Sequence, residues 1–514
     1  MTNKKNLLLA TSVLYYSYLF YEQSAGINFL VFNIAMIAIV LSLRNNIWKE
    51  KTWLVVAFGC LLSSACIVYH HTNLAVYTNL ISLLGLAGLS YERRASLATA
   101  LPNALIALFS SHVIALTERL GMNKVDDNQA QIKTNGIEKL TKRVIRIGLP
   151  MVVTLLFAII YMGANPAFNH FIINLFTFNS LTISWSWVFF TLGGFMLLFP
   201  FFYPHIATEL AGLDLANKDK LLRARRSVKE ATFKMLDLKN EYQTGWLMLA
   251  MLNGLLLMVN GLDVYYLWII QQLPEGIVYA DYVHQGVYAL IFSIVLAISI
   301  ILYFFRRNLN FLTQNQKLKT VAYIWILQNA FLVFTTYCKT MTYVNQFGIT
   351  HKRIGVFVYL TLTLIGLITT FIKIYKVRSS WFLFRKNTWA FYVVLLIAAC
   401  FNWDRIITEH NLHNINKKEI DLMYLVNDLS DTNLPELIEY VKKLPDNHQT
   451  TEYQPISPYS SEQSTTTYNT KELVRQKKAV FQRIYHEQKE KGNCWQSWNL
   501  DRERVFKIIN KVSL

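Results

Sequence analysis

The sequence predicts an all-α fold: a polytopic transmembrane helical bundle of about 11 spans plus one re-entrant or interfacial segment, with an α-helical extracytoplasmic C-terminal tail. Three observations support it. Of 514 residues, 53% are hydrophobic and only 16% are charged, which is too apolar for a soluble protein of this length. The apolar residues form runs of roughly 16 to 25, long enough to cross a hydrocarbon core about 30 Å thick. Basic residues gather in the short loops between these runs. This composition excludes a cytosolic enzyme.

The positive charge belongs to the membrane part of the chain. Up to Trp403 there are 34 Lys and Arg against 16 Asp and Glu, whereas the remaining residues carry 16 of each. In a soluble protein such an excess would indicate nucleic-acid binding, but in short loops it acts as an orientation signal beside anionic lipid. We therefore expect the lipid bilayer as partner, with anionic lipid at the basic loops, and no nucleic acid.

Twelve apolar segments are candidate spans. The first, Asn6–Tyr21, follows two lysines and resembles a signal sequence, but it lacks a small-x-small cleavage site, so we interpret it as an uncleaved first span. The other segments are Ile27–Leu43, Trp53–Tyr69, Leu74–Leu89, Ala95–Leu116, Ile147–Met162, Leu181–Phe202, Gly245–Ile269, Val287–Phe305, Val321–Cys338, Ile354–Tyr375 and Thr388–Phe401.

Charge asymmetry predicts the orientation. If all twelve segments crossed, the basic loops would fall on both sides, against the positive-inside rule. If one segment before residue 119 does not cross, roughly 30 Lys and Arg lie inside and about 3 outside. Ala95–Leu116 is the candidate, because Pro102-Asn103 interrupts it as in a re-entrant or surface-lying helix pair; the alternative is a kinked span there and a different early segment lying flat. Either way, we expect a bacterial plasma (inner) membrane protein with a cytoplasmic N-terminus and an outer tail.

The chain then divides by composition. The tail begins with amphipathic helices, continues through a Ser/Thr/Gln/Tyr/Pro-rich stretch that cannot bury a core, and ends in further helices. The basic stretch Lys220–Lys239 has helical periodicity and either lies on anionic lipid or extends the neighbouring span. The predicted regions are 1–403, the transmembrane domain with basic cytoplasmic loops 119–146 and 204–243; 404–445, a helical tail segment; 446–468, a flexible polar linker; and 469–514, a C-terminal helical segment.

Two charged residues fall inside apolar runs, where ionisable groups are expensive and often functional. Asp263 shares a helical face with Asn253 and Asn260, and Lys339 shares one with Gln328 and Thr335. Both charges lie at a similar depth, so an ion pair of Asp263 with Lys339, or with Arg353, is expected to border a polar cavity. The alternative is that Lys339 snorkels to the interface while Asp263 sits among headgroups.

Further polar groups occur in the outer loops of the predicted topology. Asp281, Thr350 and Arg353 would supply hydrogen bonding beside the charged pair, or would only pin helix ends. No catalytic residue or cofactor is predicted. Glu409, His410 and His413 have a plausible spacing for helical metal ligands, and His70-His71 lie in an outer loop, but no third or fourth ligand at a fixed spacing completes a metal site. The candidate substrate-binding residues are Asp263, Lys339, Asn253, Asn260, Gln328, Asp281, Thr350 and Arg353.

Short motifs carry a family resemblance. The motifs are Leu273-Pro274-Glu275-Gly276, Tyr279-Ala280-Asp281-Tyr282, Gly286, Tyr343-Val344, Gly348-Ile349-Thr350, Arg353, Asp421–Leu425, Leu429-Ser430-Asp431, Leu434–Leu437 and Ser497-Trp498-Asn499. They resemble segments of uncharacterised bacterial multi-pass membrane proteins grouped as domain of unknown function 4173. The resemblance implies a membrane fold with a boundary near residue 403, and it implies no activity or catalytic residue.

Three functions remain open at this stage. The first is a non-enzymatic sensing, scaffolding or envelope-associated component, with a protein partner bound through the tail. The second is a small-solute transporter that uses a polar cavity near Asp263 and Lys339. The third, a membrane-embedded enzyme acting on lipid-linked substrates, lacks an identifiable base or nucleophile.

Overall fold

The computed structural model describes most of the chain. The helices and strands given below lie within residues 2–44, 46–92, 95–119, 184–204, 208–221, 233–270, 279–305, 308–312, 315–414, 421–445, 448–455, 463–490 and 495–511, with residues 154, 161, 165 and 168 described singly. The predicted span Ile147–Met162, loop 119–146 and most of Lys220–Lys239 fall outside the described residues. Residues 233–239 belong to the same helix as the span that follows, as in the extension alternative.

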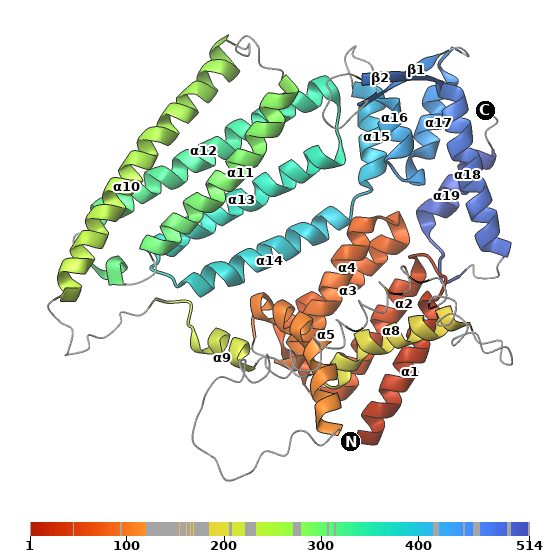
Figure 1. Cartoon of the computed structure of the whole chain (residues 1–514), viewed down its shortest axis with the longest axis horizontal. Helices are drawn as coiled ribbons and strands as arrows, with labels where there is room; N and C mark the ends of the chain where they lie inside the picture. The colour runs from red at the N-terminus through yellow and green to blue at the C-terminus, as the bar shows by residue number, and fades with distance from the viewer. Residues whose placement is uncertain are drawn as a thin grey trace. The chain divides into compact units, whose positions relative to one another are not determined.

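Helices dominate the described residues, which confirms the predicted all-α, polytopic bundle (Figure 1). Among these residues, eight helices are long and apolar enough to cross a membrane. The helices α1 (Thr2–Phe20), α2 (Ile27–Leu43) and α11 (Tyr279–Phe304) are not among these eight. The eight are α3 (Lys51–His70), α4 (Asn73–Tyr91), α5 (Leu97–Arg119), α8 (Trp185–Phe202), α10 (Phe233–Val264) with its π-helical extension η3 (Tyr265–Ile270), α12 (Gln316–Phe347), α13 (His351–Tyr375) and α14 (Ser380–Ala399).

The segment Ala95–Leu116 was expected to be a re-entrant or surface-lying helix pair, and the structure shows something else. Instead of a helix pair broken at Pro102-Asn103, the structure has the single helix α5, with Pro102 near its start. A proline there removes only one early hydrogen bond, so the helix continues. At the start of α5, the Asp214 carboxylate of α9 (Thr208–Ala216) accepts hydrogen bonds from the Ser96 amide at 2.6 Å and the Thr99 hydroxyl at 2.8 Å. This carboxylate satisfies the amide hydrogen of Ser96, the residue just before the helix.

The chain forms two compact units: unit 1 is Met1–Ala216 with Glu490–Leu500, and unit 2 is Asn217–Lys489 with Asp501–Leu514. The predicted boundary near residue 403 falls inside unit 2. Within unit 2, Ile349 and Ile354 pack against the buried tail core, so the tail is not a separate body there. The apolar side chains of the turn and of the tail form one continuous cluster, and the composition of the sequence does not reveal such packing.

A short C-terminal segment completes the loop between α1 and α2 in unit 1. The amides of Ile27 and Asn28, at the start of α2, donate to the carbonyls of Trp498 and Gln496 at 3.1 and 3.0 Å. A Cβ added at Gly26 would lie 2.6 Å from a Ser497 backbone atom, so glycine permits this close approach. Residues 496–498 therefore satisfy helix-start amides that α2 leaves unbonded.

The membrane part of unit 2 comprises helices α10 to α14. They lie side by side in Figure 1, with α10 at one edge and α12 packed against it. Their interior is apolar. It is formed by Leu249, Ile294, Ala297, Ile301, Phe304, Phe305, Leu309, Leu318, Ala322, Trp325, Ile326, Val333, Leu360, Leu367 and Ile374.

Five helices form the tail part of unit 2. They are α15 (Trp403–Asn414), α16 (Leu422–Asn427), α17 (Leu434–Lys442), α18 (Thr470–Glu490) and α19 (Leu500–Asn510). The sequence predicted the start of α18: the Asn469 side-chain oxygen accepts the amides of Lys471 and Glu472 at 3.0 and 3.2 Å. The buried tail core is Ile407, Leu422, Leu425, Val426, Leu429, Leu434, Leu437, Ile438, Val441, Val474, Phe481, Val505 and Ile509.

The predicted flexible linker 446–468 contains regular structure. Strands β1 (Gln449–Pro455) and β2 (Gln463–Asn469) pair antiparallel, with Gln449 opposite Asn469 and Pro455 opposite Gln463. Polar, Thr-rich residues form a hairpin because the strand ladder satisfies the backbone without an apolar core. Composition alone had indicated the opposite.

Candidate functional site

Helices α10 and α12 meet along a polar seam. The Asn253 amide nitrogen donates to the Leu249 carbonyl at 2.7 Å and to the Val321 carbonyl at 3.1 Å, and the Asn260 amide donates to the Gln328 carbonyl at 3.1 Å. Both interhelical bonds join residues 68 positions apart, so the two helices run parallel and in register. A repeat of seven residues on each helix brings the predicted stripes together.

Asp263 and Lys339 close the outer end of this seam under the predicted topology. The Lys339 ammonium lies 2.5 Å from one Asp263 carboxylate oxygen, and the Thr335 hydroxyl donates to the other at 2.8 Å. The two charged side chains are only 12% and 7% exposed. Burial this deep is tolerable only with direct pairing, because an unpaired charge would bear the full desolvation cost. Helix α10 becomes the π-helical η3 just beyond Asp263.

Some acceptors in the seam are not satisfied. The side-chain oxygens of Asn253, Asn260 and Gln328 are buried and have no hydrogen-bond partner among the described residues. Amide oxygens of this kind accept hydrogen bonds from water or ligate hard cations. The seam therefore combines a closed ion pair with three available acceptors.

Arg353 is not the partner of Asp263. Its guanidinium donates to the carbonyl of Phe347 at 2.8 Å and to that of Gly348, and it lies 4.2 Å from the Tyr343 ring centroid. A cation at these carbonyls stabilises the end of α12. Of the two partners considered for Asp263, the structure selects Lys339.

The remaining predicted residues serve helix ends. The Thr350 hydroxyl accepts the Arg353 amide at 3.4 Å and caps α13. Asp281 lies in the first turn of α11, and its side chain is outside the described part of the chain. Neither residue is brought to the Asp263–Lys339 pair by a described contact.

The turn between α12 and α13 is fixed by the tail. Gly348 has φ +77° and ψ −179°, a conformation that is nearly restricted to glycine. The Asn411 side chain of α15 accepts the Ile349 amide at 2.6 Å and donates to the Ile349 carbonyl at 2.9 Å. A Cβ on Gly348 would lie 2.6 Å from the same Asn411 oxygen. We call this arrangement the α12–α13 corner; the sequence carried no signal for Asn411.

An ion pair adds to the corner. The His351 ring nitrogen lies 2.6 Å from the Asp404 carboxylate of α15, and the His351 amide donates to the Tyr424 hydroxyl at 3.0 Å. Desolvation opposes the charge on Asp404, yet hydrogen bonds from His351 and Ser430 outweigh it and lower the pKa of that carboxyl. The tail is thus bonded to the corner from two helices.

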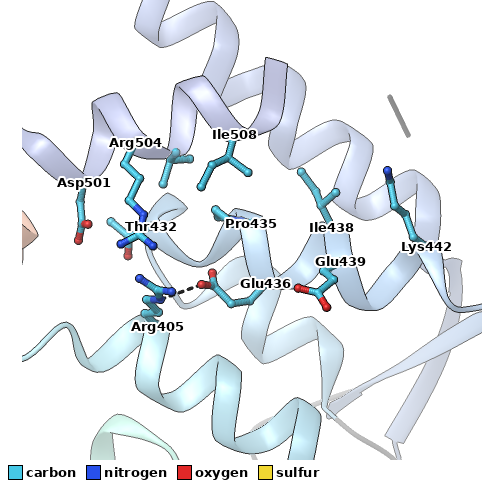
Figure 2. A pocket seen from close by; sticks show the side chains of 11 residues that line it. Arg405, Thr432, Pro435, Glu436, Ile438, Glu439, Lys442, Asp501, Arg504 and Ile508 are labelled. Carbon is cyan, nitrogen blue, oxygen red and sulfur yellow. Dashed lines mark ion pairs between the residues drawn. The ribbon is translucent and has the colours of Figure 1, made fainter. Parts of the chain in front are cut away.

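The tail contains a pocket of about 370 Å³ between α15, α17 and α19 (Figure 2). The Arg405 Nε lies 2.8 Å from one oxygen of Glu436, whereas the other oxygen is buried with no partner among the described residues. Arg504 points toward Arg405 in Figure 2. Burial raises the pKa of Glu436 despite Arg405 and Arg504. The lining is Arg405, Thr432, Pro435, Glu436, Ile438, Glu439, Lys442, Asp501, Arg504, Val505 and Ile508.

A buried lysine lies elsewhere in the tail. The Lys477 ammonium of α18 donates to the carbonyls of Leu425 and Leu429 at 3.4 and 2.9 Å and to the Asn433 side-chain oxygen at 3.2 Å. Burial lowers the pKa of Lys477 to about 8, although the charges of Asp431 and Asp404 oppose this shift. Composition and periodicity gave no indication of this residue.

The apolar helices and the buried seam between two of them define a multi-pass helical membrane protein. A family profile, "Domain of unknown function (DUF4153)", matches residues 12–440, and the chain belongs to that family. The resemblance to domain of unknown function 4173 was therefore wrong, because it rested on short motifs of Gly, Pro and aromatic residues that recur at helix ends in membrane proteins. No curated protein and no solved structure matches this chain.

Proposed function

We propose that this protein is a non-enzymatic sensing or scaffolding component of a bacterial cell envelope, with its tail outside the plasma membrane and a protein partner bound through that tail. The observation that carries the proposal is the bonding of Asn411 to both backbone groups of Ile349. A tail held at a helix–helix turn presents a fixed surface and can pass a displacement into α12 and α13.

The seam supports a structural use of its polar groups. Asp263 is already bonded to Lys339 and Thr335, and the amide nitrogens of Asn253 and Asn260 are bonded to carbonyls of α12. Interhelical hydrogen bonds of this type hold membrane helices together where the hydrophobic effect supplies no driving force between them. These contacts favour a rigid helix pair over a passage.

The role is tested by cross-linking and flux measurements on the full chain. Cysteine-directed cross-linking from Glu439→Cys, in a background without native cysteines, should join one partner in native membranes in a fixed ratio. The same probe at Arg483→Cys, on another tail helix, should give a different adduct or none. Proteoliposomes should show no solute flux above that of protein-free vesicles; a saturable flux would contradict the proposal.

Orientation and lipid contact are part of the same proposal. A reporter active only in the cytoplasm should give signal after residue 239 and none after residue 430, because Lys and Arg favour the cytoplasmic side. Vesicles containing phosphatidylserine should bind the full chain's basic loops more strongly at low salt than at high salt. The reverse reporter pattern would refute the orientation.

A transporter is the second candidate, and the three unsatisfied amide oxygens of Asn253, Asn260 and Gln328 favour it. Acceptors in a row beside an ion pair could hold water or a cation during passage. Flux of a small cation that is lost in Asn260→Leu but kept in Asn315→Leu would support transport. Asn315 is buried but bonds only to nearby carbonyls outside the seam.

A further inference from the structure

We propose that the tail pocket binds a small zwitterion with an apolar body, such as a free apolar amino acid or a dipeptide. The inference deepens the proposed sensing function and rests on it. It is carried by groups that line the pocket: two guanidinium groups, a carboxylate with one unbonded oxygen, and apolar side chains.

The guanidinium groups form the site for a carboxylate. Arg405 comes from α15 and Arg504 from α19, and they point toward each other in Figure 2. Arg405 bonds Glu436 through Nε, which leaves its two terminal nitrogens available. Arg504 lines the pocket and interacts electrostatically with Glu436, and its fork suits a carboxylate in bidentate geometry. The Asp501 carboxylate, which accepts a hydrogen bond from the Asn402 amide at 2.8 Å, also lines the pocket.

The carboxylate of Glu436 is the site for an ammonium group. One oxygen is bound by Arg405, while the other is buried, is bonded to no described residue and borders the pocket. A buried acceptor without a donor is costly, and a charged donor would offset that cost. Glu439, one turn further along α17, adds negative charge at the same side. An α-amino acid places its ammonium and carboxylate only a few bonds apart, which suits adjacent Glu436 and Arg504.

Apolar side chains define the rest of the ligand. Pro435, Ile438, Val505 and Ile508 also line the pocket. The volume of about 370 Å³ exceeds that of one amino acid and admits a dipeptide or an amino acid with water. The pocket is therefore large enough for a ligand with one or two hydrophobic side chains.

Titration calorimetry on the full chain in nanodiscs tests the proposal with leucine, leucyl-leucine, N-acetyl-leucine and leucinamide. Leucine or leucyl-leucine should bind saturably, and removing either charge should weaken binding about tenfold or more. Arg504→Gln should weaken it similarly without lowering the melting temperature. Arg483→Gln, an exposed arginine on α18 outside the pocket, is the matched control and should bind as wild type does.

Each contrary result overturns the proposal. Absence of saturable binding by folded wild type would do so, as would equal affinity for N-acetyl-leucine, which would indicate a simple anion site. Unchanged binding by folded Arg504→Gln would place the ligand elsewhere. The cross-linking and flux measurements use no added ligand, so the proposed sensing or scaffolding function is decided separately from this pocket.

Discussion

Lys339 in α12 and Lys477 in α18 are both buried ammonium groups, but they are held differently. Lys339 lies 2.5 Å from a carboxylate, whereas Lys477 contacts only neutral oxygens at 2.9 to 3.4 Å. The contrast shows how a buried ammonium group is stabilised between membrane helices and in the tail. Between membrane helices a charge is compensated by an opposite charge in direct contact, while in the tail carbonyls near a helix end suffice and leave the ammonium easier to deprotonate.

The largest expected effect tests the charge pair. Asp263→Asn and Lys339→Met should each lower stability by about 3 to 5 kcal/mol, because each leaves one charge buried without compensation. The double substitution should recover much of that loss. Thermal unfolding in detergent, followed by tryptophan fluorescence, measures all three. Asp263→Asn with Arg353→Met is the control and should be additive, since Arg353 bonds carbonyls instead; equal, additive losses in both double variants would refute direct compensation.

The next prediction asks whether the tail and the membrane helices are stabilised separately. Gly348→Ala should lower the stability of the tail by about 1 to 3 kcal/mol, because alanine disfavours this backbone conformation and its Cβ would displace Asn411. Gly355→Ala, in α13 with open space around it, should be neutral or slightly stabilising. Hydrogen exchange of α15 and α10 measures the two regions. Equal loss of protection in both would show that they unfold together.

The smallest effect concerns pH. The folded pKa of Lys477 is lowered to about 8 from an ordinary value near 10.5, so between these values the unfolded chain binds more protons than the folded one. Tail stability should therefore rise as pH increases from about 8 to 10.5. Lys477→Met should flatten this dependence, and Lys478→Met should not. Denaturant melts at several pH values measure this dependence. If the Lys477→Met variant showed the same pH dependence as wild type, the contrast with Lys339 would be refuted.

The sequence predicted much of the membrane fold and part of the seam. Apolar length identified the helices, and helical spacing placed Asn253, Asn260 and Asp263 on one face. It could not choose between Lys339 and Arg353, because the choice depends on the turn that directs Arg353 back to its own helix end. Long-range backbone contacts leave little trace in composition, so the sequence did not predict the hydrogen bonds between Asn411 and Ile349.

The same limit applies to the tail. Its polar hairpin was predicted as a flexible linker because a Thr-rich stretch has no apolar periodicity. The pocket was missed because Arg405, Glu436 and Arg504 come from three helices that only tertiary packing brings together. Single-sequence reasoning identifies faces of helices, but not which faces meet.

The contact of Gly26 with residues 496–498 has a consequence for biosynthesis. Ser24 and Ser497 are hydrogen-bonded across 473 positions, so the loop before α2 emerges from the ribosome long before its partner. Until residues 496–498 are translated, the amides of Ile27 and Asn28 must be satisfied by water or a chaperone. Unit 1 can reach its finished form only after residues 496–498 have been made, so a molecule that ends before them lacks these contacts.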